Sequence, residues 1–287
     1  MHKKGSQMEK DRKDPQNKPV IVIAEIGENH LGNMKIARQL IREAAQAGAD
    51  YVKFQSYKAE NFRKDDPEYK WFKKVALSEE DHFQLKKYAD KHKIKFLSSP
   101  FCLGSARFLC EKLGLEEIKI ASGVMLNSGL LQYVNIRAKK VFLSTGMATL
   151  DEIGYALSYL KNVKDVVILH CVTQYPCRDE EANLRAITTL KGRFPNYVIG
   201  YSDHTVGIEA CLSAVALGAK VIEKHFTSDK KAKQGTDHIL SVTADELKTM
   251  IKSIRKIETQ LGSKEKEPTR SERSIIQFVR NRFLGNG

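Results

Sequence analysis

The 287-residue chain is long enough for one large α/β domain or for two small ones, since a (β/α)₈ barrel takes about 250 residues. Its 41% hydrophobic content supports a sizeable core, and no apolar run reaches the roughly 18 residues that a membrane-spanning helix needs. The N-terminus is polar and charged and does not resemble a secretory signal, so we expect a cytoplasmic protein that does not contact membranes.

Neither the charge nor the cysteine pattern indicates a nucleic-acid site or a thiolate metal site. The net charge of +13 is concentrated at the ends: residues 1–19 hold six Lys/Arg against three acidic residues, and residues 252–287 hold nine against four. No stacking aromatic residues are interleaved with these basic residues, so we expect no nucleic-acid binding. The five cysteines show no CxxC pairing, which argues against a disulfide framework and a cysteine-built zinc site.

Short β-branched runs alternate with amphipathic helical patterns from residue 20 onward. The first helical pattern, Met34–Ala47, places Ile36, Leu40, Ile41 and Ala44 on one face, which is the spacing of a buried stripe. Further helices are predicted over Glu79–His92, Thr149–Leu160, Gly207–Leu217 and Ala244–Leu261. The predicted strands are Val20–Ala24, Tyr51–Phe54, Ile94–Leu97, Glu117–Ile120, Lys140–Leu143, Val166–Leu169, Tyr197–Gly200 and Lys220–Glu223.

Eight strands with intervening helices are the number expected for a single-domain (β/α)₈ TIM barrel. An open doubly wound sheet is the alternative, but no GxGxxG motif follows the first strand. We predict the barrel over residues 20–262, with residues 1–19 as an N-terminal extension or barrel cap and residues 263–287 as a basic C-terminal segment. Residues 56–77 are predicted to form a long charged loop that carries the only tryptophan, Trp71, and loops of this length often act as a lid or a contact surface.

Polar side chains stand where the predicted strands end, which is the face of a TIM barrel that carries the active site. Lysines and hydroxyls that converge there suit a phosphate and a carboxylate. His204 and His225 end neighbouring strands and can reach one divalent ion, although a single histidine is more often structural. The series includes Glu25, Lys53, Gln55, Ser99, Lys119, Ser122, Ser144, His170, Tyr175, Ser202, His204, Lys224 and His225.

At these residues the chain resembles the sialic acid synthase family, whose members make N-acetylneuraminate and related nonulosonates. Eight stretches match the family in order and in spacing over roughly residues 20–245. They are IAEIGENHLGN (23–33), AGADYVKFQ (47–55), FLSSPF (96–101), IKIASG (118–123), LSTGMA (143–148), LHCVTQYP (169–176), IGYSDHT (199–205) and EKHFT (223–227).

The resemblance implies a synthase that condenses phosphoenolpyruvate with an N-acetylated amino-sugar aldehyde to give a nonulosonic acid and phosphate. It implies that His204 and His225 bind a divalent metal, with Mn²⁺ expected and Mg²⁺ and Co²⁺ as alternatives. The implied catalytic residues are Glu25, Lys53, Lys119, His204 and His225. The implied phosphoenolpyruvate positions are Lys53, Ser99, Lys119, Ser122, Ser144, Tyr175 and Ser202, and the implied sugar positions are Gln55, Tyr175 and Asp237.

Two departures from the family pattern fall on the acceptor side. Family members commonly carry an acidic residue after the ASG of the fourth strand, where this chain has Val124. The chain stops at FLGNG, where family members continue into a small antifreeze-like domain that donates an arginine to the sugar site of the other subunit. The acceptor therefore stays open among N-acetylmannosamine, a diacetamido-dideoxy hexose and a phosphorylated sugar, and so does the choice between a homodimer and a separate antifreeze-like domain protein.

Two other functions have to be distinguished from the synthase. A Schiff-base aldolase would use Lys53 or Lys119 as a covalent nucleophile, but it would leave the histidine pair and the serines unexplained. A catalytically impaired barrel that binds sugar or phosphoenolpyruvate, or a subunit that needs a separate lid protein, is suggested by Val124 and the missing domain.

Overall fold

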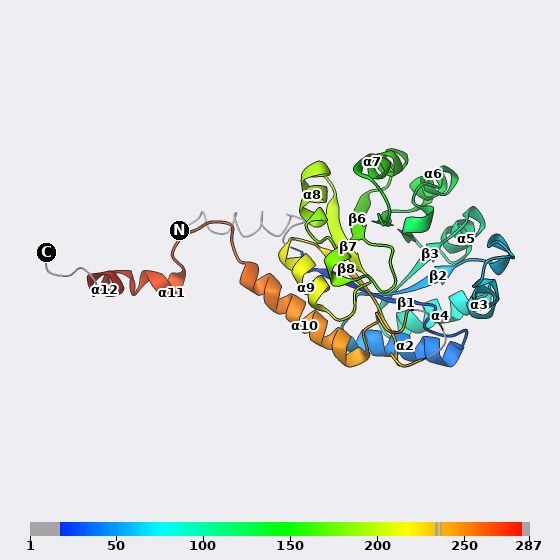
Figure 1. The fold of residues 1–287 in the computed structure, drawn as a ribbon, viewed down its shortest axis with the longest axis horizontal. Coiled ribbons are helices and arrows are strands. Elements are labelled where there is room, and N and C mark those ends of the chain that lie inside the picture. Colours follow the sequence, from blue (N-terminus) through cyan, green and yellow to red (C-terminus); the bar gives the residue numbers. More distant parts are fainter. Residues whose placement is uncertain (1–17, 233–234, 236, 283–287) are drawn as a thin grey trace.

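Eight parallel strands form a nearly closed barrel in the computed structural model, which describes residues 18–232, 235 and 237–282. Backbone ladders run through the order β3-β2-β1-β8-β7-β6-β5-β4, and β3 and β4 contact each other across the remaining gap (Figure 1). The TIM-barrel prediction is therefore confirmed. The strands are β1 (Ile21–Gly27), β2 (Tyr51–Ser56), β3 (Lys95–Pro100), β4 (Glu117–Ile120), β5 (Lys140–Ser144), β6 (Asp165–Cys171), β7 (Val198–Asp203) and β8 (Val221–His225).

Most strands continue beyond their predicted ends, so several polar residues that were expected in loops lie within the sheet. β7 runs to Asp203 and β8 runs to His225, whereas β4 has its predicted bounds. Ser202 is in register with Glu223, and Asp203 is in register with Lys224, because ladder formation depends on backbone groups and does not require apolar side chains. The ladders therefore hold functional side chains on rigid strands.

Helices cover the outside of the barrel, and several begin with good capping residues. Ser78 forms a capping box with Asp81 at the start of α4, and Thr149 does the same with Glu152 for α7. Gly48 ends α2 with a φ of 94°, a backbone angle that residues with a Cβ atom rarely adopt. The helices around the barrel are α2 (Met34–Ala47), α4 (Glu79–Lys91), α5 (Leu103–Arg107), α6 (Ser128–Arg137), α7 (Leu150–Tyr159), α8 (Ala186–Arg193), α9 (Glu209–Ala216) and α10 (Ala244–Leu261).

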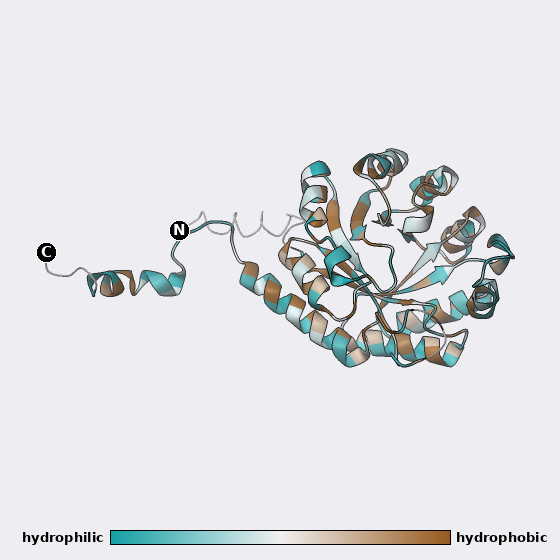
Figure 2. Ribbon diagram, in the orientation of Figure 1, coloured by the Kyte–Doolittle hydropathy of each residue, from teal (hydrophilic) through white to brown (hydrophobic). Residues whose placement is uncertain are grey.

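Two layers of apolar residues fill the fold. The larger layer packs the outer faces of the strands against the helices and includes Val22, Leu40 and Ile254. The smaller layer lies inside the barrel, where the Tyr51 ring meets the edge of Phe142. Helices such as α2 and α10 alternate between teal and brown along their length in Figure 2, as expected for helices with one buried face. The barrel interior toward the strand ends is left to polar side chains.

Two further segments lie outside the repeating barrel pattern. Residues 56–77, predicted as a loop, contain the short helical elements η2 (Ala59–Asn61) and α3 (Tyr69–Val75), so that prediction is wrong in part. Beyond α10, the short helices α11 (Arg270–Arg273) and α12 (Ile276–Asn281) lie apart from the barrel in Figure 1. The predicted extension over residues 1–19 falls mostly outside the described residues. No helix within the described ranges has the length and apolarity needed to cross a bilayer.

A buried ion pair on the outer side of β7 and β8 fixes the ends of these strands. Lys224 and Asp203 are fully buried, and Nζ of the lysine lies 2.7 Å from Oδ2 of the aspartate. The other carboxylate oxygen accepts hydrogen bonds of 2.9 Å from the Tyr201 hydroxyl and from the backbone N–H and hydroxyl of Thr205. Because every partner is satisfied, the pair can be buried without leaving an isolated charge.

Replacing Lys224 with methionine leaves the Asp203 carboxylate buried without its cation. We expect Lys224→Met to lower the free energy of unfolding by about 3–5 kcal/mol, as measured by urea denaturation. The matched control is Arg63→Ala, which breaks the exposed ion pair with Asp65 and should leave the denaturation midpoint nearly unchanged. Equal losses in the two variants would contradict the structural role of the buried pair.

Candidate functional site

A cavity of about 640 Å³ opens at the carboxyl ends of the strands, and residues on or directly after all eight strands contribute to its lining. The structure brings every site residue implied by the family resemblance to this one cavity, as expected for the catalytic face of a TIM barrel. These residues are Glu25, Lys53, Gln55, Ser99, Lys119, Ser122, Ser144, Tyr175, Ser202, His204, His225 and Asp237.

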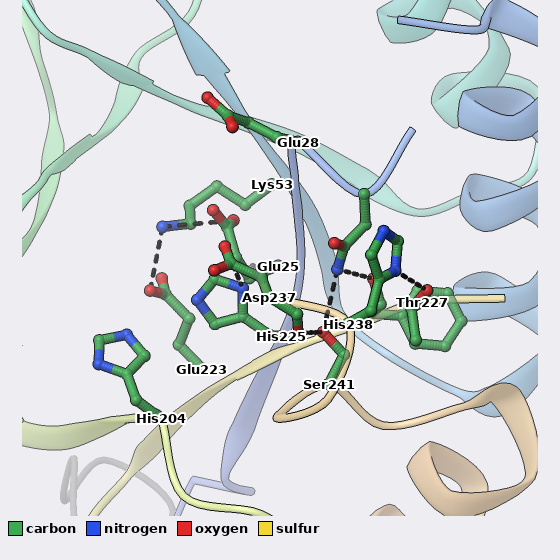
Figure 3. Close-up of polar contacts among 12 residues, drawn as sticks. Glu25, Glu28, Lys53, His204, Glu223, His225, Thr227, Asp237, His238 and Ser241 are labelled. Carbon is green, nitrogen blue, oxygen red and sulfur yellow. Dashed lines mark hydrogen bonds and ion pairs between the residues drawn. The ribbon is translucent and has the colours of Figure 1, made fainter. Parts of the chain in front are cut away.

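Two buried lysines and two buried glutamates form a charged cluster in this lining. Lys53 Nζ lies 3.0 Å from Glu223 Oε1, and Lys119 Nζ lies 2.7 Å from the same oxygen. The Ser202 hydroxyl donates to this oxygen at 2.9 Å, and Glu25 Oε2 lies 3.3 Å from Lys53 Nζ. Figure 3 shows Lys53 reaching both carboxylates. Each buried charge therefore has an opposite charge beside it, as burial requires.

The pKa values of the cluster follow from the balance of burial and pairing. Burial alone would raise the pKa of Glu223, but the two lysines outweigh it and hold that pKa well below its usual value. Burial lowers the pKa of Lys119 to about 8, because attraction to Glu223 is partly offset by repulsion from Lys53. Burial also raises the pKa of Glu25 to about 7, against the attraction of Lys53. The cluster therefore keeps a net positive charge near neutral pH.

Two imidazoles face each other at the ends of β7 and β8. The ring centroids of His204 and His225 are 5.3 Å apart, with an angle of 60° between the ring planes. His204 Nδ1 lies 2.6 Å from the carbonyl oxygen of Val172, which places the proton on Nδ1 and leaves Nε2 as a lone-pair donor. His225 Nδ1 lies 3.4 Å from Asp237 Oδ2. Burial lowers the pKa of both imidazoles to about 3, so both are neutral.

The imidazole pair matches part of the ligand set of a divalent ion. Among the described residues, no group of three or more His, Cys, Asp or Glu side chains is arranged to hold a metal. An ion at this position would take two nitrogen ligands from His204 and His225. Its other coordination positions would go to water or substrate, as in catalytic metal sites that keep open positions.

Serine hydroxyls complete the polar lining. The Oγ atoms of Ser99 and Ser144 are buried and have no hydrogen-bond partner within the described structure. Ser122 Oγ accepts a hydrogen bond of 2.9 Å from the backbone N–H of Gly146, so its own proton stays available. Buried hydroxyls are normally hydrogen-bonded, so the Ser99 and Ser144 hydroxyls suit a bound anion, with the Ser122 hydroxyl in the same cavity lining.

Sequence reasoning missed Glu223 and gave two other residues the wrong orientation. Glu223 stands two residues before His225 on one strand, and this spacing places both side chains on the inner face. Lys224 lies between them and faces outward, and His170 Nε2 lies 2.9 Å from the carbonyl oxygen of Ala182, so neither lines the cavity. The alternation of side chains along β8 was the feature of the sequence that could have indicated that Glu223 faces inward with His225.

One side of the cavity was also not predicted. Phe62, Glu68 and Phe72 line it from the segment around α3, together with Glu28 from the β1–α2 loop. Aromatic residues scattered in a charged segment show no periodic pattern, so their convergence was not visible in the sequence. Val124, where an acidic residue was expected, packs against the core and is not in the cavity lining.

The NeuB family model matches residues 40–266, which is most of the chain. The chain belongs to the NeuB family. The prediction of a sialic acid synthase-like protein is thereby confirmed at the level of the family.

Several relatives of the chain are named as synthases of acidic sugars. The chain is 43% identical to the N,N'-diacetyllegionaminic acid synthase of Campylobacter jejuni, over 93% of this chain and 85% of that protein. It is 34% identical to the human N-acetylneuraminate-9-phosphate synthase, over 87% of this chain and 73% of that protein. The crystal structure of the N-acetylneuraminic acid synthetase of Leptospira borgpetersenii, in complex with citrate, has a TM-score of 0.87 and 38% identity and covers 94% of both chains.

Removing the charge of Glu223 tests the electrostatics of this NeuB site. Glu223 raises the pKa of Lys119, so Glu223→Gln should move that pKa below its value of about 8. A titration of the lysine ¹³Cε resonances by NMR measures the change. The control Glu68→Gln alters a carboxylate in the cavity lining that has no contact with the lysines, and it should leave Lys119 unchanged. A raised pKa of Lys119 in Glu223→Gln would contradict the arrangement.

Proposed function

We propose that this chain condenses phosphoenolpyruvate with an N-acetylated amino-sugar aldehyde, giving a nonulosonic acid and phosphate. The enol C3 forms the new bond to the aldehyde carbon, water adds at C2, and phosphate leaves. The observation that carries the proposal is the buried cluster of Lys53, Lys119 and Glu223 beside two facing imidazoles at the barrel mouth. Membership of the NeuB family supports the same reaction class.

The donor is assigned to the lysines and serines. Phosphoenolpyruvate carries a carboxylate and a phosphate, and the positive charge of Lys53 and Lys119 would neutralise part of this charge. The hydroxyls of Ser99 and Ser144 have no partner in the cavity lining and would donate to the same anion. Held on strand ends, these groups would fix C3 in one position, which contributes to rate mainly through orientation.

We propose a divalent ion on His204 and His225, with Mn²⁺ as the first choice and Mg²⁺ and Co²⁺ as alternatives. The bound ion would act as a Lewis acid toward the aldehyde oxygen. The hydrogen bond from Nδ1 of His204 to Val172 supports this assignment, because it orients the ring and leaves Nε2 for a ligand.

The remaining steps are assigned to residues around the acceptor. Glu25 is buried, and its Oε2 makes no hydrogen bond in the described structure although Lys53 lies 3.3 Å away. This carboxyl group is our candidate for holding a proton of the attacking water or of the new hydroxyl. Gln55, Tyr175 and Asp237 line the same cavity and are assigned to the acceptor sugar.

Phosphate release tests the proposed reaction directly. With phosphoenolpyruvate, Mn²⁺ and a panel of amino-sugar aldehydes, we expect stoichiometric release of phosphate and formation of a 2-keto acid. Lys119→Met should raise the KM for phosphoenolpyruvate by about 10- to 100-fold, the loss expected for one charged hydrogen bond. The acceptor KM serves as the internal control. No release with any acceptor would favour a binding protein, and a borohydride-trapped lysine adduct would favour a Schiff-base aldolase.

Metal removal tests the role of the imidazole pair. A chelator or the substitution His225→Ala should abolish turnover, and titration calorimetry should show that Mn²⁺ binds the unaltered protein but not the variant. His92→Ala, at the end of α4 and outside the cavity lining, is the control and should bind Mn²⁺ normally. Full activity without a divalent ion would remove the metal from the proposal.

A further inference from the structure

Glu28 anchors one side of the cavity through both of its carboxylate oxygens. The Tyr57 hydroxyl donates to Oε1, and the indole N–H of Trp71 donates to Oε2, each at 2.5 Å. Tyr57 directly follows β2, whereas Trp71 lies in α3. A single carboxylate from the β1–α2 loop therefore joins both ends of the segment 57–75, and Figure 3 shows it apart from the Lys53–Glu223 ion pair.

Beside this anchor, aromatic rings pack into a continuous surface that we call the aromatic wall, made of Tyr57, Phe62, Phe72 and Phe101. The Phe62 and Phe72 rings are stacked, with centroids 4.4 Å apart and an angle of 22° between planes. Tyr57 meets the other three rings edge-on, at centroid distances of 5.1 to 5.9 Å. The three phenylalanines line the cavity, so the aromatic wall presents an apolar face to a ligand.

Close backbone approaches limit the freedom of this segment. A Cβ on Gly32, in the β1–α2 loop, would lie 2.6 Å from the carbonyl oxygen of Lys74, so the end of α3 rests against that loop. A Cβ on Gly235, in the segment between β8 and α10, would lie 3.1 Å from the Trp71 ring. The helix α3, which carries Phe72 of the aromatic wall, is therefore held from two sides and forms part of the site rather than a detached loop.

Acidic and basic side chains line different parts of the cavity. Glu28, Glu68 and Asp237 line the cavity on the side of the aromatic wall and of the β8–α10 segment. Glu28 and Asp237 are close enough for the negative charge of Asp237 to raise the pKa of Glu28, after the larger effect of burial. Among the described residues that line the cavity, the lysines are Lys53 and Lys119, and both are paired with Glu223.

We infer that the aromatic wall and the carboxylates beside it select an uncharged acceptor sugar with an apolar substituent at the end remote from its aldehyde, with Glu28 as the positioning residue. This inference rests on the proposed function. The methyl of an N-acetyl group or of a deoxy carbon packs on Phe62 and Phe72, and a hydroxyl or amide N–H donates to a free lone pair of Glu28. A phosphate at the same place would face Glu28, Glu68 and Asp237, and the lysines among the described lining residues, Lys53 and Lys119, are already paired with Glu223, so its binding there is strongly unfavourable.

Steady-state kinetics with three acceptors test the selectivity: N-acetylmannosamine, its 6-phosphate and a diacetamido-dideoxy hexose. We expect the kcat/KM for the 6-phosphate to be lower than that of either uncharged sugar by about tenfold or more. Glu68→Lys should raise the kcat/KM for the 6-phosphate relative to that for the uncharged sugars. Glu60→Lys makes the same charge change in η2, outside the cavity lining, and should have no such effect.

The single tryptophan of the chain reports on the anchor itself. Glu28→Gln removes the negative charge and leaves one acceptor oxygen for the two donors, Tyr57 and Trp71, so we expect a shift in the Trp71 fluorescence emission and a rise of about tenfold in the acceptor KM. The KM for phosphoenolpyruvate should not change. Tyr57→Phe removes only the hydrogen bond from the Tyr57 hydroxyl to Glu28 and keeps the aromatic ring. It should also raise the acceptor KM, without a change in the packing volume of the aromatic wall.

The outcomes separate this inference from the proposed function. Turnover of the 6-phosphate as efficient as that of the uncharged sugars would overturn the inference while supporting the reaction. An acceptor KM and a Trp71 emission that stay unchanged in Glu28→Gln would overturn the positioning role. A lack of phosphate release with all three acceptors, while phosphoenolpyruvate still binds, would overturn the proposed function and the inference together.

Discussion

The site depends on the cost of burying two like charges next to each other. Lys53 and Lys119 are both almost completely inaccessible to water, and an uncompensated ammonium in such a place would deprotonate or destabilise the barrel. Glu223 makes the arrangement possible because one of its oxygens accepts from both lysines and from Ser202. The positive charge of the two lysines is not fully neutralised, because burial favours the neutral form of Glu25. A bound anion can neutralise the rest.

The same alternation of side chains along β8 separates chemistry from stability. Glu223 and His225 face the cavity, whereas Lys224 between them faces outward and pairs with Asp203. One strand therefore carries a functional cluster on its inner face and a structural ion pair on its outer face. The outer pair holds the ends of β7 and β8. At these ends the ring centroids of His204 and His225 lie 5.3 Å apart.

The two sides of the cavity have different chemistry. The lysines and the unpartnered serine hydroxyls lie on strands and suit a compact anion. The aromatic wall and its carboxylates come from loops and short helices, and they suit an uncharged, partly apolar molecule. In TIM barrels reactions are built on strand ends while loops vary, so this division matches a reaction type held by the barrel and a specificity held by the segment 57–75.

The sequence alone determined the barrel and most of the site. Eight β-branched runs separated by amphipathic helices leave few topologies, and polar residues at the strand ends must then meet at one mouth. Only the tertiary structure decided which neighbours on a strand face inward, because alternation puts Glu223 and Lys224 on opposite faces of β8 but the packing of the barrel sets which face lines the cavity. It also decided the aromatic wall, since the bonds of Glu28 to Tyr57 and Trp71 join residues 29 and 43 positions apart. No local pattern encodes such contacts, because their strength comes from packing between distant segments rather than from periodicity.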